Sequence, residues 1–133
     1  MIKEFYSKVL PSTGLYCIFT IDKVDSKKVR PHWVESIDAL DTKISELKEA
    51  NQYHIFVALS SFNKASRVAK EANSVRSFFV DLDVGEGKGY PSKEEAISAL
   101  TTFVQDVQLP PPVRVDSGRG IHAYWILDTD VNA

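Results

Sequence analysis

The stretch VRSFFVDLDV, residues 75–84, followed by the glycine-rich GEGKG, decides how the second half of this chain folds. Alternate residues of a β-strand point to the same face. From residue 78 onward the even positions are apolar, while positions 81 and 83 are acidic. We therefore predict a strand over Val75–Val84 that ends at the glycines. Its apolar face turns to the core, and Asp81 and Asp83 lie together on the opposite face.

A helix and a hairpin follow this strand. Ser92 and Glu95 form a capping box, and apolar residues recur at helical spacing until three prolines, beginning at Pro110, stop the helix. Val113–Asp116 and Ile121–Leu127 are then typical of two strands joined by a tight turn, whose two glycines are expected to take positive φ. The order strand, helix, strand, strand predicts part of an RNA-recognition-motif-like (ferredoxin-like) βαββ unit.

The residues before this unit predict an αβ module. Its expected elements are a short helix from Ile2 to Val9, a strand over Leu15–Val24, an amphipathic helix from Trp33 to Ala50 and a strand over Tyr53–Ser60. The last strand is apolar on both faces, which predicts a central place in its sheet. The predicted fold class is therefore α+β, with an αβ module at 1–74 and the RNA-recognition-motif-like part, which holds the candidate site, at 75–133.

Composition limits the classes of protein to consider. The 133 residues are 44% hydrophobic with a formal charge of −2, which suits a single domain and argues against a protein that coats duplex DNA by bulk charge. No apolar run approaches the roughly 20 residues of a membrane span, no secretory signal is recognisable, and Cys17 is the single cysteine. We expect a soluble cytoplasmic protein with no membrane partner.

Positive charge is concentrated in one segment. Residues 62–76 carry Lys64, Arg67, Lys70 and Arg76 against a single acid. Two interpretations stay open for this segment. It is either an ordinary solvated surface or a surface that holds a nucleic-acid template.

The paired acids of the central strand are candidates for metal binding. Asp81 and Asp83 lie about 6–7 Å apart at Cα when they share a strand face, so their side chains can converge on a divalent cation. Mg²⁺ and Mn²⁺ prefer such oxygen ligands and retain waters that substrate phosphates can replace. The alternative is a strand end whose acids simply face water.

The hairpin turn is a candidate phosphate site. Ser117, Gly118 and Arg119 precede Gly120, and a glycine-containing turn lets backbone N–H groups approach a phosphate while the hydroxyl and the guanidinium donate to it. His122 then lies on the strand face opposite the core, where it is either a ligand-binding residue or a structural hydrogen-bonding residue.

The glycine-rich loop holds one further candidate. Lys88 either reaches a nucleotide phosphate or is a solvated turn lysine. The loop lacks the spacing and the Lys-Ser/Thr pair of a P-loop, which excludes that class.

With SFFVDLDVGEGKGYPSKEEA followed by PPPVRVDSGRGIHAYWIL, the chain resembles the catalytic core of the archaeo-eukaryotic primase superfamily, particularly the primase-polymerases of phages and plasmids. The family's first motif, two acids alternating with apolar residues, falls on Asp81 and Asp83. Its second motif, a small residue and a histidine in a glycine-containing turn and strand, falls on Ser117 and His122. The resemblance implies that the acids bind catalytic Mg²⁺ or Mn²⁺ and that Ser117 and His122 contact the phosphates of the incoming nucleotide.

The resemblance also implies a function and partners. The function is template-directed transfer of nucleotides to a 3′-OH during DNA replication, by a bacterial, phage or plasmid protein. The implied partners are nucleoside triphosphates, a single-stranded DNA template and a helicase domain or protein.

A third family motif, an acid on a later strand, is missing before Ala133. Asp128 and Asp130 come too early, and nothing in the sequence indicates that Asp116 substitutes. We therefore expect a single catalytic domain, truncated on its C-terminal side, that binds metal and nucleotide weakly and does not synthesise a primer alone.

Two other classes stay open. A non-catalytic single-stranded nucleic-acid-binding module of this fold would show exposed aromatic residues on its sheet face and would need no acids there. A metal-dependent nuclease would use the same carboxylates and histidine to cleave an existing strand instead of releasing pyrophosphate.

Overall fold

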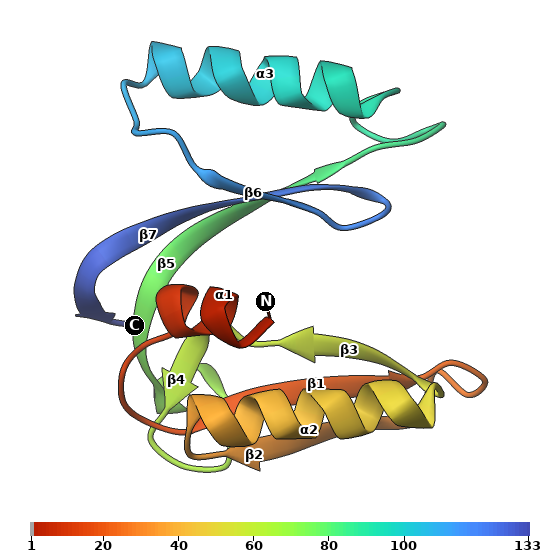
Figure 1. Ribbon diagram of the computed structural model, residues 1–133, viewed down its shortest axis with the longest axis vertical. Helices are drawn as coiled ribbons and strands as arrows, with labels where there is room; N and C mark the ends of the chain where they lie inside the picture. The colour runs from red at the N-terminus through yellow and green to blue at the C-terminus, as the bar shows by residue number, and fades with distance from the viewer. Residues whose placement is uncertain (1) are drawn as a thin grey trace. The chain divides into compact units, whose positions relative to one another are not determined.

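The computed structural model describes residues 2–133, which form two compact units (Figure 1). Unit 1 comprises residues 2–76 and 128–133, and unit 2 comprises Ser77–Leu127. Two long strands, β5 (Ala72–Asp83) and β7 (Gly120–Asn132), contribute to both units and are neighbours in a sheet of order β4-β5-β7-β6. The fold is α+β, as predicted.

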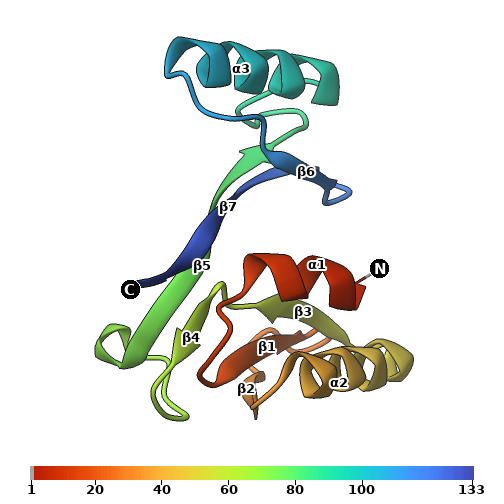
Figure 2. The same ribbon diagram turned by 60° about the vertical axis from the view of Figure 1, so that its left-hand side comes forward.

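Unit 1 contains a three-stranded antiparallel sheet of order β2-β1-β3. The elements of unit 1 are α1 (Ile2–Val9), β1 (Tyr16–Asp22), β2 (Val29–Val34), α2 (Ile37–Ala50), β3 (Tyr53–Val57), β4 (Ser60–Phe62) and a 3₁₀ turn at Ala69–Glu71. In Figure 2, α2 lies beside β1 and β2. Burial, and then the charge of Lys43 in α2, lower the pKa of His32, which is the register partner of the fully buried Ile18. Ile18 and Thr20 are buried on this face, whereas Phe56 on the other face is 51% exposed, and α2 contacts β1 and β2, so the face that carries Ile18 and His32 packs on α2.

The helix predicted from Trp33 begins only at Ile37. Ser36 caps it, because its hydroxyl accepts a hydrogen bond from the Ala39 N–H at 3.1 Å. Trp33 lies instead in β2, opposite Cys17, with its ring edge-on to Phe62 at 5.3 Å. The four-residue step from Trp33 to Ile37 has the spacing of a helical stripe, but Trp33 is a partly buried residue of a strand.

The strand predicted over Tyr53–Ser60 is two strands, and its predicted central position is wrong. β1 is central, and β3 is an edge strand that ends at Val57. The chain then leaves this sheet, and β4 pairs with β5 in the other one. Phe56, which made the strand apolar on both faces, is 51% exposed on the outer face, so it does not indicate burial.

The end of β7 is tied to the start of the chain within unit 1. The Asp130 carboxylate accepts hydrogen bonds from the Ser12 N–H at 2.9 Å and the Ser12 hydroxyl at 2.7 Å, and it pairs with Arg76 at 3.1 Å. The bond from the Ser12 hydroxyl contributes most to lowering the pKa of Asp130. Asp130 thus has a structural role in unit 1.

Unit 2 has the strand order expected of a βαββ unit. It contains α3 (Lys93–Asp106), β6 (Val113–Asp116) and parts of β5 and β7. β7 lies between β5 and β6, which is the arrangement of the first three strands in a ferredoxin-like fold. The Ser92 hydroxyl accepts a hydrogen bond from the Glu95 N–H at 3.2 Å, so the predicted helix cap is confirmed.

The helix α3 packs on one of the two faces of the unit 2 sheet. Val80 and Leu82 of β5 line an apolar hollow together with Leu100 and Phe103 of α3, so this face packs on the helix. Phe78, on the same face by strand alternation, is 58% exposed. The predicted apolar face of the strand is therefore only partly buried, and Asp81 points to the other side of the sheet.

None of the helices within residues 2–133 combines the length and apolar character that crossing a membrane requires.

Candidate functional site

Asp81 of β5 and His122 of β7 meet on the sheet face that points away from α3. The His122 Nε2 atom lies 3.3 Å from Asp81 Oδ1, and the two side chains remain 29% and 50% exposed respectively. The structure thus brings together one residue from each of the two predicted motifs. Both are accessible to a ligand.

Two aromatic residues orient His122. Phe79 stacks on Tyr124 with ring centroids 5.6 Å apart and meets the His122 ring edge-on at 5.9 Å. The Tyr124 hydroxyl lies 3.4 Å from His122 Nδ1. When this hydroxyl donates to Nδ1, the proton of the neutral ring is on Nε2 and donates to the Asp81 carboxylate.

Tyr124 is suited to the role of donor. Burial, and secondly the negative charge of Asp81, raise the pKa of its phenol, which therefore stays protonated at neutral pH. Strand alternation in β7 places Tyr124 on the same face as His122, two residues away. Phe79 precedes Asp81 by two residues, so strand alternation also places it on the face that carries Asp81.

Asp83 lies on the same face by strand alternation and is exposed. Within residues 2–133, the structure brings no three His, Cys, Asp or Glu side chains close enough together to hold a metal ion. The available donors are two carboxylates on one strand, the first of them paired with His122. Carboxylate oxygens fit Mg²⁺ and Mn²⁺, whose remaining positions are commonly filled by waters and substrate phosphates. Asp81 and Asp83 thus fit a cation site that needs further ligands.

The predicted phosphate-binding turn adjoins the end of β5. The Arg119 carbonyl accepts a hydrogen bond from the Val84 N–H at 3.1 Å, and the Ser117 N–H donates to the Gly120 carbonyl at 3.0 Å. Ser117, Gly118 and Arg119 are all exposed. The turn is therefore held beside the residue that follows Asp83, with its side chains facing solvent.

Gly120 is required here because of a close contact between two strands, and not because of a positive φ. Gly118 has the expected positive φ, 86°, but Gly120 does not. A Cβ atom added to Gly120 would stand 2.2 Å from the Leu82 carbonyl oxygen. Only glycine lets β7 approach β5 this closely, and His122 follows two residues later.

Asp116 does not supply the missing acid. Its carboxylate accepts hydrogen bonds from the Lys93 ammonium at 2.8 and 3.0 Å and from the Gly118 N–H at 2.8 Å. Lys93 contributes most to the lowering of its pKa. Because Asp116 pairs with Ile121 in the ladder and contacts α3, it lies on the face opposite Asp81. It is a residue that holds the turn.

Lys88 lies in the exposed glycine-rich loop. The loop is closed by hydrogen bonds from Lys88 N–H to the Gly85 carbonyl at 3.1 Å and from Tyr90 N–H to the Asp83 carbonyl at 3.2 Å. Within residues 2–133, no described hydrogen bond or ion pair joins the Lys88 ammonium to Asp81 or His122. The role of Lys88 in phosphate binding stays a prediction.

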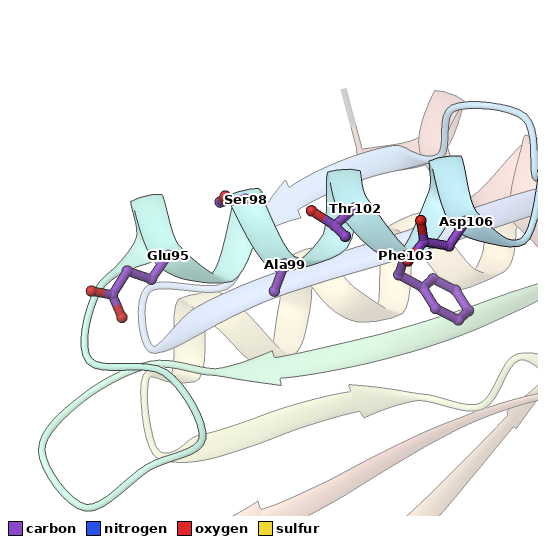
Figure 3. A pocket seen from close by; sticks show the side chains of 6 residues that line it. All are labelled: Glu95, Ser98, Ala99, Thr102, Phe103 and Asp106. Carbon is purple, nitrogen blue, oxygen red and sulfur yellow. The ribbon is translucent and has the colours of Figure 1, made fainter.

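A shallow hollow also lies along α3 (Figure 3). It is lined by Glu95, Ser98, Ala99, Thr102, Phe103 and Asp106. All six residues come from one helix, and the two carboxylates stand near its opposite ends. The hollow gathers no convergent polar groups, so we assign no binding role to it.

Comparison with known proteins gives one informative similarity. No protein-family model and no solved structure matches the chain. A curated protein named "Replication protein" from Clostridium perfringens is 31% identical over 91 residues, which cover 65% of this chain and 21% of the relative. The chain thus spans about a fifth of the length of this relative, and it is similar to one part of a replication protein.

Proposed function

We propose that this chain acts in replication and that unit 2 is the metal- and nucleotide-binding part of a primase-polymerase nucleotidyltransferase. The observation that carries the proposal is the contact between Asp81 and His122 on the sheet face away from α3, beside the turn at residues 117–119. The similarity to a replication protein supports a role in replication.

In this proposal Asp81 and Asp83 hold Mg²⁺ or Mn²⁺. The cation, when bound, neutralises charge on the transferring phosphoryl group and lowers the pKa of a hydroxyl or water that it contacts. When Asp81 binds the cation, the His122 Nε2–H that faces Asp81 in the free chain donates to the triphosphate instead, together with the Ser117 hydroxyl and the Arg119 guanidinium. Their donors suit phosphate oxygens, and none of them reads a base edge.

The proposed reaction is a displacement at phosphorus. The 3′-oxygen of a primer or initiating nucleotide forms a bond to the α-phosphorus, and the bond from that phosphorus to the bridging oxygen of the β-phosphate breaks. Pyrophosphate leaves, and the hydroxyl proton passes to water. Tyr124 and Phe79 fix the His122 ring, so its Nε2–H stays directed at the strand that carries the acids.

A second candidate function is binding of single-stranded nucleic acid on this face without catalysis. Phe79, 48% exposed and stacked on Tyr124, favours it, since such rings serve as stacking platforms for bases. The two exposed acids on the same face favour catalysis, because carboxylates repel a nucleic-acid backbone unless a cation lies between them.

A primer-extension assay tests the proposal. The 133-residue chain and a chain extended past Ala133 are incubated with a 5′-labelled primer on a single-stranded DNA template, nucleotides and Mn²⁺. We expect the longer chain to lengthen the primer and to release pyrophosphate, and the 133-residue chain to bind without synthesis, because its metal site is one expected acid short. A chelator should abolish extension.

The alternatives give different products. Shortening of the labelled strand would support a nuclease. Nucleic-acid binding with neither extension nor cleavage by the longer chain would support the non-catalytic module and would overturn the proposal.

A further inference from the structure

Unit 1 has a second sheet face, opposite α2, that is open and apolar. The ladder registers place Phe19 of β1 opposite Pro31 of β2 and Phe56 of β3, on the face away from Ile18. The open part of this face, called here the Phe56 face, consists of Phe19, Ile21, Val29, Pro31, His54 and Phe56. Phe56 and Val29 are each 51% exposed, and none of the six residues is acidic.

An arginine lies on this face. The Arg67 guanidinium carbon stands 3.8 Å from the centroid of the Phe19 ring, which is a close cation–π contact. Arg67 is itself exposed, so the outer side of its planar group remains accessible. The face thus offers two flat surfaces for stacking, the Phe56 ring and the Arg67 guanidinium supported by Phe19.

Two lysines lie close to this arginine in the chain. They are Lys64 and Lys70, and the segment of residues 63–70, which holds all three cations, carries no acid. The Lys64 ammonium lies 3.6 Å from the Glu71 carboxylate, whose side chain is 16% exposed, while the Lys64 side chain is 68% exposed. Glu71 therefore offsets one of the three positive charges of the segment. The segment therefore presents a net positive charge beside the Phe56 face.

We propose that the Phe56 face binds single-stranded nucleic acid. Bases stack on Phe56 and on the Arg67 guanidinium, and backbone phosphates contact Lys64, Lys70 and Arg67. Flat apolar groups next to mobile cations are the combination that proteins use for single strands, where every base exposes a π-face and every phosphate a charge. A duplex hides its base faces, and the chain's net charge of −2 argues against duplex binding by bulk charge.

This inference concerns a surface separate from Asp81 and His122. Binding on the Phe56 face does not require the proposed chemistry. The further step, that the bound strand is the template, rests on the proposed function.

Fluorescence anisotropy of labelled 15-nucleotide dT and U strands, measured in chelator without nucleotide, tests the surface. We expect Phe56→Ala to weaken binding about tenfold, since one lost base stack changes affinity by roughly this factor. Arg67→Lys, which keeps the charge but removes the planar group, should weaken it about threefold. Phe103→Ala is the matched control, because Phe103 is a similarly exposed phenylalanine, 46%, on α3 of unit 2 (Figure 3).

Further variants make each outcome decisive. Phe56→Tyr keeps a ring and should bind as the unchanged protein does, which separates loss of stacking from loss of fold. Asp81→Asn with Asp83→Asn should not weaken binding, since no metal is present. The dT and U arms show whether DNA or RNA is preferred.

Three outcomes would each overturn the inference. They are equal affinity of Phe56→Ala and the unchanged chain, no binding at all, and equal binding of duplex. Loss of binding in a Phe79→Ala variant alone would assign the single strand to unit 2 instead.

Discussion

Replacing both acids, Asp81→Asn with Asp83→Asn, is expected to reduce Mn²⁺ affinity by about 100-fold or more. Each change keeps the side-chain shape but removes a negative charge, and ligand charge is the main determinant of affinity for hard cations. A loss of about 1.4 kcal/mol for each charge gives a factor of about ten per site. Calorimetric titration with Mn²⁺, on the unchanged chain and the double variant, measures the difference.

The control for this experiment is Asp116→Asn. Asp116 belongs to the same unit and is exposed, but its carboxylate is engaged with Lys93 and Gly118 on the other face of the sheet. The Asp116→Asn change should leave Mn²⁺ affinity unchanged. Equal Mn²⁺ affinity of the double variant and the unchanged chain would mean that the acids simply face water.

Gly120→Ala is expected to destabilise unit 2 by about 3 kcal/mol or more, at the upper end of the range for overpacking a close contact. The added methyl would meet the Leu82 carbonyl oxygen at 2.2 Å, and neither backbone can yield without breaking the pairing of β5 with β7. His122 would then lose its place beside Asp81. Chemical denaturation followed by circular dichroism and tryptophan fluorescence measures the loss, with Trp125 reporting on unit 2.

The matched control is Gly118→Ala in the same hairpin. Its added methyl would meet nothing within 4 Å, so the change introduces only the strain of a positive φ, about 1 kcal/mol. If the two variants were equally stable, the close approach at Gly120 would not be what holds the strands together.

The sequence predicts those parts of the fold that depend on local signals. Strand alternation places Asp81 opposite the helix-covered face, and the Ser92 cap and the turn at Gly118 are found where expected. Each of these features depends on residues only a few positions apart. For the same reason the face that carries His122 follows from the pattern of β7 alone.

Other features depend on partners that are distant in the chain, so the sequence alone does not reveal them. The sequence pattern does not predict β2 as a strand, because this segment contains Pro31 and Arg30. The structure tolerates the proline because β2 is an edge strand that pairs with β1. The engagement of Asp116 by Lys93 and the contact of Gly120 with Leu82 arise only when the strands and α3 assemble.

The candidate site, too, is predicted from the sequence only in part. Its residue types and their faces follow from the motifs, whereas the pairing of His122 with Asp81 and the support from Phe79 and Tyr124 come from the packing of two strands. The assignment of metal to Asp81 and Asp83 stays a prediction.

The most direct test of the central claim is to locate Mn²⁺ and nucleotide on the chain by paramagnetic broadening of its backbone amide resonances. We predict that substoichiometric Mn²⁺ first broadens residues 79–84 and 117–122, and that any of the four nucleoside triphosphates strengthens this effect, but not in His122→Ala. Broadening that begins instead at the acidic residues of α2, which are Asp38, Asp41, Glu46 and Glu49, or an effect of nucleotide that differs between bases, would contradict the account.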